Sequence, residues 1–155
     1  MPKYWLFKSE PDVFSIDDLA KEPKKTTYWN GVRNFQARNF IRDEMKKGDM
    51  VLFYHSNTNP MAVVGICKIV KEAYPDYTAF DSNSEYFDPK SKKDSPAWFM
   101  VDIKLFKKFK KPVSLSDIKN NSKLKNIRLV QRGNRLSVFP IEKNEYIEIL
   151  KMSEV

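Results

Sequence analysis

The stretch from residue 26 to residue 56 constrains the fold most, because a helix pattern passes directly into a strand pattern there. Asn34 can cap a helix, and the apolar residues that follow recur at the spacing of one helix face. These residues are Ala37, Phe40, Ile41 and Met45. Gly48 ends the pattern, and residues 50–54 form an unbroken apolar run of strand length. The stretch therefore predicts a helix packed against the core, followed at once by a buried strand.

Groups suited to a flat, charged ligand stand at both ends of this stretch. Tyr28 and Trp29 precede an Asn-Gly turn, whose glycine, Gly31, allows the backbone to approach another group closely. The strand ends in a Tyr-His-Ser run at residues 54–56. Arginines at positions 33, 38 and 42 lie outside the apolar helix face and suit phosphate groups or stacking on bases. We expect this stretch to hold a planar group and an anionic group close together.

Elsewhere the sequence alternates between short strand patterns and short helix patterns. Strand patterns cover residues 3–8, 61–70, 98–106 and 136–140, and helix patterns begin at residues 16, 115 and 142. Gly65 interrupts the second strand pattern and predicts a bulge or a close approach, and residues 74–96 predict a long ordered loop. Short strands at irregular spacing, interrupted by helices, favour an α+β domain around a small mixed or barrel-like sheet. We expect one domain over residues 1–155.

The amino-acid composition restricts the class of binding partner only weakly. The chain carries a formal net charge of +8, which favours polyanions, although lysine-rich compositions also have other origins. Lysine runs such as residues 107–111 are interpreted first as solvated faces and only second as phosphate contacts. Cys67 is expected to be a small buried hydrophobe in a reducing compartment. The sequence contains no apolar span of about 18 residues, so we expect no membrane helix.

Several kinds of catalytic or metal site lack their motifs. A single His and a single Cys, far apart in the chain, leave no zinc pattern, and we expect no metal or cofactor. Phosphate-binding and dinucleotide-binding glycine motifs are also absent from the sequence. His55 beside Ser56, or paired with Ser9 or Ser137, leaves a small hydrolase as a minor alternative. No G-x-S-x-G turn supports it, and the simpler interpretation of His55 is a polar residue at a strand end.

The tryptophans and tyrosines allow two interpretations. They could line a cage that stacks a flat base, a contact that contributes roughly 1–3 kcal/mol per base. Composition alone favours core packing for most of them, whereas the polar neighbours of Trp29 and Tyr54 favour the cage. The candidate residues are Trp5, Tyr28, Trp29, Tyr54 and Trp98.

Six blocks of the sequence, in the family's order and spanning nearly the whole chain, closely resemble the EVE domain. The most specific is W-N-G-V-R-N-F-Q-A-R-N, within residues 28–57. The others cover residues 4–11, 62–76, 96–103, 112–119 and 135–141. The resemblance implies a fold related to the PUA domain, with the YTH and SRA domains as wider relatives. That fold is an α+β, PUA-like curved mixed β-sheet or pseudo-barrel flanked by short helices.

The same resemblance implies a pocket that accepts a flipped, chemically modified base, with modified cytosine in DNA as the usual candidate and RNA less settled. We expect Trp29 and Tyr54 to stack on the base, and Asn30, Ser9 or Ser56 to bind its edge. Phe35 and Phe139 stand where the family is expected to vary. The complete set of expected binding residues is Lys8, Ser9, Glu10, Trp29, Asn30, Gly31, Val32, Arg33, Asn34, Arg38, Tyr54, His55, Ser56, Arg132, Ser137 and Phe139.

The sequence thus predicts a monomeric, non-enzymatic nucleic-acid reader that does not bind membranes. The main alternative is a general RNA-binding, PUA-like module without a preference for modified bases. We expect a bacterial cytoplasmic protein, because no nuclear-targeting extension precedes Met1, and a nuclear location if the source is eukaryotic.

Overall fold

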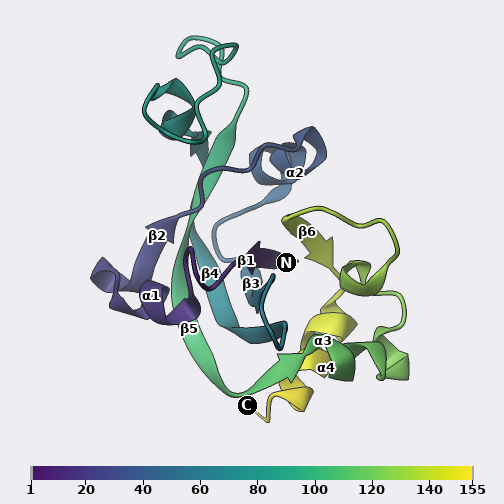
Figure 1. Ribbon diagram of the computed structural model, residues 1–155. Helices are drawn as coiled ribbons and strands as arrows, with labels where there is room; N and C mark the ends of the chain where they lie inside the picture. Colours follow the sequence, from purple (N-terminus) through teal and green to yellow (C-terminus); the bar gives the residue numbers. More distant parts are fainter. Residues whose placement is uncertain (1, 155) are drawn as a thin grey trace.

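The computed structural model describes residues 2–154 and shows a curved, six-stranded mixed sheet with short helices around it (Figure 1). The sheet order is β2-β5-β4-β3-β1-β6, with β1 parallel to β3 and every other neighbouring pair antiparallel. The predicted α+β class with a curved mixed sheet is therefore confirmed. The strands are β1 (Tyr4–Ser9), β2 (Thr26–Tyr28), β3 (Met50–His55), β4 (Ala62–Pro75), β5 (Phe99–Ser114) and β6 (Val138–Ile141).

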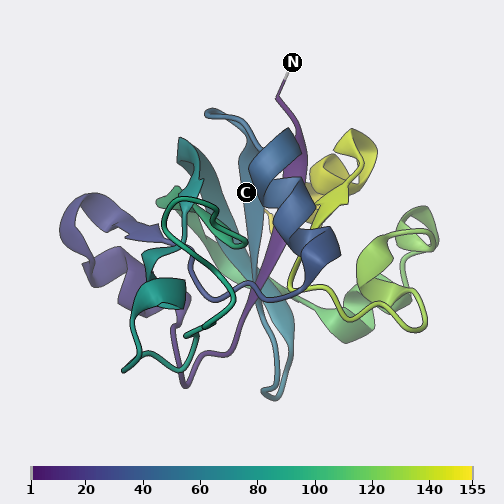
Figure 2. The same cartoon turned by 90° about the horizontal axis from the view of Figure 1, so that it is seen from above.

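The helices lie around the edges and over one face of this sheet. Seen from above, α2 crosses over β1 and β3, while α1 lies on the opposite side of the molecule from α3 and α4 (Figure 2). The α-helices are α1 (Ile16–Lys21), α2 (Phe35–Asn39), α3 (Leu115–Lys119) and α4 (Lys143–Met152). Single turns are η1 (Pro23–Lys25), η3 (Tyr77–Phe80), η4 (Ser122–Leu124) and η5 (Arg128–Val130), and a wider π-turn, η2 (Phe40–Glu44), continues α2. None of the helices within residues 2–154 is long and apolar enough to cross a membrane.

Local sequence signals explain where the helices begin. Ser15 and Asp18 form a reciprocal capping box at α1, and the Asn34 side chain accepts a hydrogen bond from the Ala37 N–H at 3.1 Å. The helix predicted after Asn34 widens into the π-turn and ends at Glu44, short of Gly48. The expected apolar face still meets the core, because the widening keeps Ile41 fully buried.

The long strands β4 and β5 bend where bulges interrupt their pairing. Gly65 lies at such a register shift, and a Cβ atom there would be 2.7 Å from the carbonyl oxygen of Lys107. The predicted close approach at Gly65 is confirmed, since no side chain fits that gap. β4 is longer than the pattern suggested, so Tyr74 and Pro75 belong to the strand and not to the loop that follows it.

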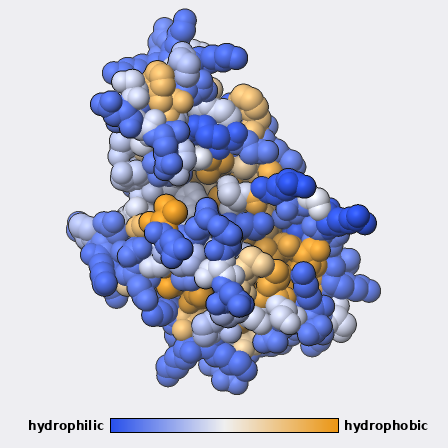
Figure 3. All heavy atoms as spheres, in the orientation of Figure 1, coloured by the Kyte–Doolittle hydropathy of each residue, from blue (hydrophilic) through white to orange (hydrophobic). Residues whose placement is uncertain are grey.

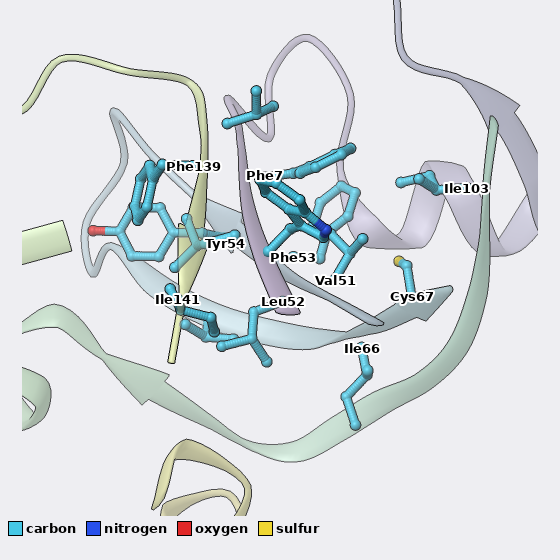
Figure 4. Close-up of a cluster of buried hydrophobic side chains, with 14 of the residues drawn as sticks. Phe7, Val51, Leu52, Phe53, Tyr54, Ile66, Cys67, Ile103, Phe139 and Ile141 are labelled. Carbon is cyan, nitrogen blue, oxygen red and sulfur yellow. The ribbon is translucent and has the colours of Figure 1, made fainter. Parts of the chain in front are cut away.

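Hydrophilic residues cover most of the molecular face shown in Figure 3, whereas a continuous apolar core packs against both faces of β1 and β3 (Figure 4). Buried Asp49 is satisfied within it, because its carboxylate accepts hydrogen bonds from the indole N–H of Trp5 (2.9 Å) and from the backbone N–H groups of Lys3 (2.9 Å) and Lys46 (3.0 Å). Trp5 is therefore a core residue and not part of a ligand cage. Cys67 is buried as predicted, and burial raises the pKa of its thiol.

Candidate functional site

A pocket of about 810 Å³ opens where the carboxyl end of β1, the strand β2 and the turn after β2 converge. Its walls come from segments far apart in the sequence, including Glu85 and Tyr86 from the loop between β4 and β5 and residues 135–137 before β6. A volume of this size suits a small planar group. The expected binding residues that line it are Lys8, Ser9, Glu10, Trp29, Asn30, Gly31, Val32, Ser56 and Ser137.

Trp29 packs on the core and also lines the pocket. Its ring is partly buried and lies 5.2 Å from that of Phe7, 5.6 Å from that of Phe53 and 6.4 Å from that of Phe14, by centroids. Its backbone N–H donates to the carbonyl oxygen of Val101 at 2.8 Å, which ties the chain after β2 to β5. Among residues 2–154 the indole N–H has no acceptor, and it stays in contact with solvent. An aromatic face and a free donor are thus held in place at the pocket wall.

The polar groups at the end of β1 are positioned by the neighbouring segments. The backbone N–H of Lys8 donates to the Ser137 carbonyl oxygen at 2.8 Å, and that of Ser56 donates to the Ser9 carbonyl oxygen at 2.9 Å. The Ser9 hydroxyl donates to the carbonyl oxygen of Phe14 at 2.5 Å, and so keeps only acceptor capacity for a ligand. Glu10 accepts a hydrogen bond from the Asn57 side chain at 2.6 Å and retains further lone pairs.

Lys8 is the half-buried cation of the pocket. Desolvation by burial lowers the pKa of its ammonium group, which lies 5.7 Å from the centroid of the Phe139 ring. Within residues 2–154 it forms no ion pair with a carboxylate. An anionic group placed beside Lys8 would therefore meet an ammonium group without an ion-pair partner, although Glu10, Glu22 and Glu85 also line the pocket.

Arg33 has a structural role in the protein, and its expected contact with a phosphate stays a prediction. Its Nη1 atom is 3.0 Å from a carboxylate oxygen of buried Asp76, and Nε and Nη2 donate to the Tyr86 carbonyl oxygen at 3.2 and 2.8 Å. The same oxygen of Asp76 accepts the Gly31 N–H at 2.8 Å. The pair therefore fastens the loop that carries Tyr86 to the turn after β2, and contacts within the protein engage four of the five Arg33 N–H donors.

The remaining polar residues expected from the Arg-Asn block also lie outside the pocket. Asn34 caps α2, and Arg38 donates to the Ala97 carbonyl oxygen at 2.7 Å while its guanidinium covers the Phe35 ring at 4.9 Å. Arg132 is exposed in the turn after η5, and Arg135 lines the pocket in its place. None of these three residues lines the pocket, and capping and loop contacts already engage the first two. A contact of Arg38 or Arg132 with nucleic acid outside the pocket stays a prediction.

Tyr54 and Phe139 are core residues, which corrects their expected contact with a base. Tyr54 is 2% exposed, Phe139 is fully buried, and burial raises the pKa of the Tyr54 phenol to about 12. Figure 4 shows the two rings close together among the apolar side chains. Trp98 is also buried, and its indole N–H donates to Asp88 at 2.7 Å, so the expected cage reduces to Trp29 and Tyr28.

His55 serves the fold and does not line the pocket. Its Nε2 atom accepts the backbone N–H of Ile16 at 3.1 Å, at the start of α1. Burial lowers the pKa of the imidazole, which favours the neutral form that this hydrogen bond requires. The interpretation of His55 as a polar strand-end residue agrees with this geometry, and the hydrolase alternative loses its proposed base. The described residues 2–154 also contain no cluster of three His, Cys, Asp or Glu side chains placed to hold a metal ion.

Sequence reasoning missed part of the pocket wall. Tyr28 was considered only as a possible cage residue. Tyr86 had no local signal, because its carbonyl oxygen is held by Arg33, which lies 53 positions away in the sequence. The apolar residue Val13 and the β-branched residue Thr26 could have indicated that the segments around them form part of the pocket wall. The missed lining residues are Val13, Phe14, Glu22, Thr26, Thr27, Tyr28, Glu85, Tyr86, Arg135 and Leu136.

Gly31→Ala is expected to weaken ligand binding and to lower stability by about 1–3 kcal/mol, because the added methyl group overpacks the pocket wall. Gly31 has φ +83°, and a Cβ atom there would lie 2.6 Å from the Tyr86 ring. Gly133→Ala is the matched control, since Gly133 has φ +82° and a Cβ atom there meets nothing within 4 Å. Thermal unfolding and a binding titration of both variants separate backbone strain from displacement of Tyr86. Equal binding losses in the two variants would contradict a role for Tyr86 in the wall.

Comparison with known proteins gives a consistent family. The EVE domain model matches residues 3–152. Human thymocyte nuclear protein 1 is 42% identical over 171 residues, covering 99% of this chain and 75% of that protein. A crystal structure of human THYN1 protein in complex with 5-methylcytosine-containing DNA superposes with a TM-score of 0.92 at 43% identity, covering 99% of this chain and 98% of that one. A crystal structure from Pseudomonas putida gives a TM-score of 0.92 at 41% identity, covering 97% and 99%. The chain therefore belongs to the EVE domain family.

Proposed function

We propose that this protein binds DNA and holds a flipped, modified cytosine in the pocket beside Trp29. The observation that carries the proposal is the partly buried indole at the wall of the 810 Å³ pocket, with its N–H free and the unpaired Lys8 nearby. Support for DNA as the partner comes from the relative solved with 5-methylcytosine-containing DNA, which is similar over nearly the whole chain. Base recognition without turnover agrees with this site, where the one histidine is committed to α1.

The proposal assigns separate tasks to the residues of the pocket. The Trp29 ring stacks on the base, as aromatic side chains do with unstacked bases. Glu10 accepts from the exocyclic amine of cytosine, which is the usual role of a carboxylate toward this base. Ser9 and Ser56 supply further polar contacts to the base edge, and Lys8 neutralises the adjacent phosphate. Tyr86 and Gly31 set the width of the slot.

The proposal is tested by fluorescence anisotropy with matched oligonucleotides that differ only in one cytosine, 5-methylcytosine or 5-hydroxymethylcytosine. We expect a preference for a modified base that persists at higher salt, because base contacts are less salt-dependent than phosphate contacts. Base extrusion costs a few kcal/mol, so plain duplex is expected to bind weakly. Equal and salt-sensitive binding to all oligonucleotides would overturn the proposal. The same series in RNA tests the alternative of a general RNA-binding module.

A further inference from the structure

A second feature adjoins the pocket at Tyr28 and extends over the outer face of β2, β5 and β4 to the turn η3. We call it the outer patch, and it consists of three aromatic and three lysine side chains: Tyr28, Tyr77, Phe106, Lys68, Lys71 and Lys104. Large rings are rarely left open to water in such numbers on one face without a partner. The exposed fractions are 44% for Tyr28, 50% for Tyr77 and 63% for Phe106.

Strand register places these residues on a common face. Lys104 pairs with Thr26 of β2 on one side and with Lys68 of β4 on the other, and directly paired residues share a face. Tyr28 pairs with Asp102, two residues before Lys104, and therefore lies on that face as well. The Tyr77 ring lies 5.4 Å from that of Tyr28. Phe106 is the extra residue of a bulge between β4 and β5, which turns its ring outward.

The lysines of the outer patch share their face with the carboxylate of Asp102, which stands opposite Lys71 in the strand register. Lys68 and Lys104 face each other across paired strands, an arrangement of like charges that destabilises a sheet. Within residues 2–154, Lys68, Lys71 and Lys104 form no ion pair. Their ammonium groups lie instead near rings: Lys68 is 5.4 Å from the centroid of Phe106, and Lys71 is 3.9 Å from that of Tyr74. The nearby carboxylate of Asp102 accepts a hydrogen bond from the Tyr74 hydroxyl at 2.5 Å.

Exposed rings interleaved with unpaired cations fit one kind of partner best. We infer that the outer patch binds single-stranded nucleic acid that flanks the base in the pocket. Unpaired bases stack on exposed rings and phosphates meet the lysines, whereas the bases of a duplex are covered by their neighbours. Tyr28 and Thr26 belong to both the patch edge and the pocket lining, so one strand can contact both. The inference rests on the proposed function for the identity of the polymer.

The test compares two triple variants that each remove two lysine charges and one exposed apolar side chain. The patch variant carries Lys68→Gln, Lys104→Gln and Phe106→Ser, none of which lines the pocket. The control carries Lys143→Gln, Lys151→Gln and Ile147→Ser on α4, where both lysines are exposed and Ile147 is 39% exposed. Thermal unfolding first establishes that both variants retain the fold. Anisotropy then measures binding to a labelled, unmodified single strand of roughly 12 nucleotides, within the range one small domain covers.

We expect the patch variant to bind this strand at least about 10-fold more weakly than the control, because one stacking contact and two phosphate contacts are lost. The slope of log affinity against log salt should become shallower by about 1.4, since each phosphate contact to a single strand contributes about 0.7. Affinity within twofold of the control would overturn the inference, as would a loss seen only with duplex. The proposed function is tested separately, by the ratio of the wild-type affinities for modified and unmodified oligonucleotides. The proposed function and the outer-patch inference can therefore fail independently.

Discussion

Replacing Trp29 by alanine is expected to remove the preference for a modified base and to weaken binding about 10- to 100-fold, because a base–aromatic stack contributes roughly 1–3 kcal/mol. The indole lines the pocket with its N–H unpaired among residues 2–154, so its loss removes both a stacking face and a donor. Anisotropy titrations with cytosine and 5-methylcytosine oligonucleotides measure the effect. If stacking on Trp29 distinguishes the two bases, the ratio of the affinities for the 5-methylcytosine and cytosine oligonucleotides should fall to about one.

Two further variants separate this effect from lost stability, because the Trp29 ring also packs against Phe7, Phe14 and Phe53. Trp29→Phe keeps an aromatic face and removes the N–H, so it should retain part of the affinity. Ile41→Ala removes a fully buried core side chain that does not line the pocket, and it is expected to cost about 2–5 kcal/mol of stability. Its folded fraction should bind with the wild-type ratio. A loss of discrimination in Ile41→Ala equal to that in Trp29→Ala would show that folding, and not stacking, sets the ratio.

Asp76→Ala is expected to be the most destabilising single substitution of the site, at about 3–5 kcal/mol, because it leaves a partly buried guanidinium without its partner. Asp76 is fully buried and accepts hydrogen bonds from the Gly31 N–H, from Arg33 and from the backbone N–H and hydroxyl of Thr78. Its loss should also free Tyr86 from the pocket wall and reduce binding. For a chain of this size, the melting temperature should fall by about 6–20 °C, measured by calorimetry.

An exposed acidic residue in an arginine pair provides the control for Asp76. Asp43→Ala breaks the contact with Arg42 at 2.7 Å, but both side chains are largely exposed, so the melting temperature should barely change. Asp76→Asn keeps an acceptor of the same shape and should fall between wild type and Asp76→Ala. If Asp76→Ala melts within a few degrees of Asp43→Ala, the ion pair with Arg33 does not hold the loop.

Local signals in the sequence predicted most of the elements correctly. The Ser15–Asp18 capping box, the Asn34 cap, the bulge at Gly65 and the turn at Gly31 depend on residues within a few positions of one another. The resemblance to the EVE domain extended this to the fold, which the comparisons confirm. Four elements differed from the predictions: the helix widens in η2, β2 had no predicted strand, and β4 and β5 are longer because they pair with each other beyond their apolar runs.

The composition of the pocket could be predicted only in part. Lys8, Ser9 and Trp29 lie where the family motifs place them, whereas Tyr54 and Phe139 share those motifs and lie in the core. Strand register does not make this difference, because Lys8 and Tyr54 are directly paired in β1 and β3 and therefore share a face. The difference comes from what packs over each residue: apolar side chains of the core cover Tyr54 and Phe139, whereas Lys8 lies at the end of β1 where the pocket opens.

The sequence by itself determined the kinds of element, their caps and turns, the excess of positive charge and the aromatic residues available for stacking. The tertiary structure alone decided which of those residues line the pocket. Tyr86 becomes a pocket wall only because Asp76 and Arg33, 43 positions apart in the chain, meet after folding. The outer patch exists only because three strands from separate segments align their lysines and rings. The Tyr86 wall and the outer patch both depend on contacts between residues far apart in the sequence. Local sequence patterns do not predict the free energy of such contacts.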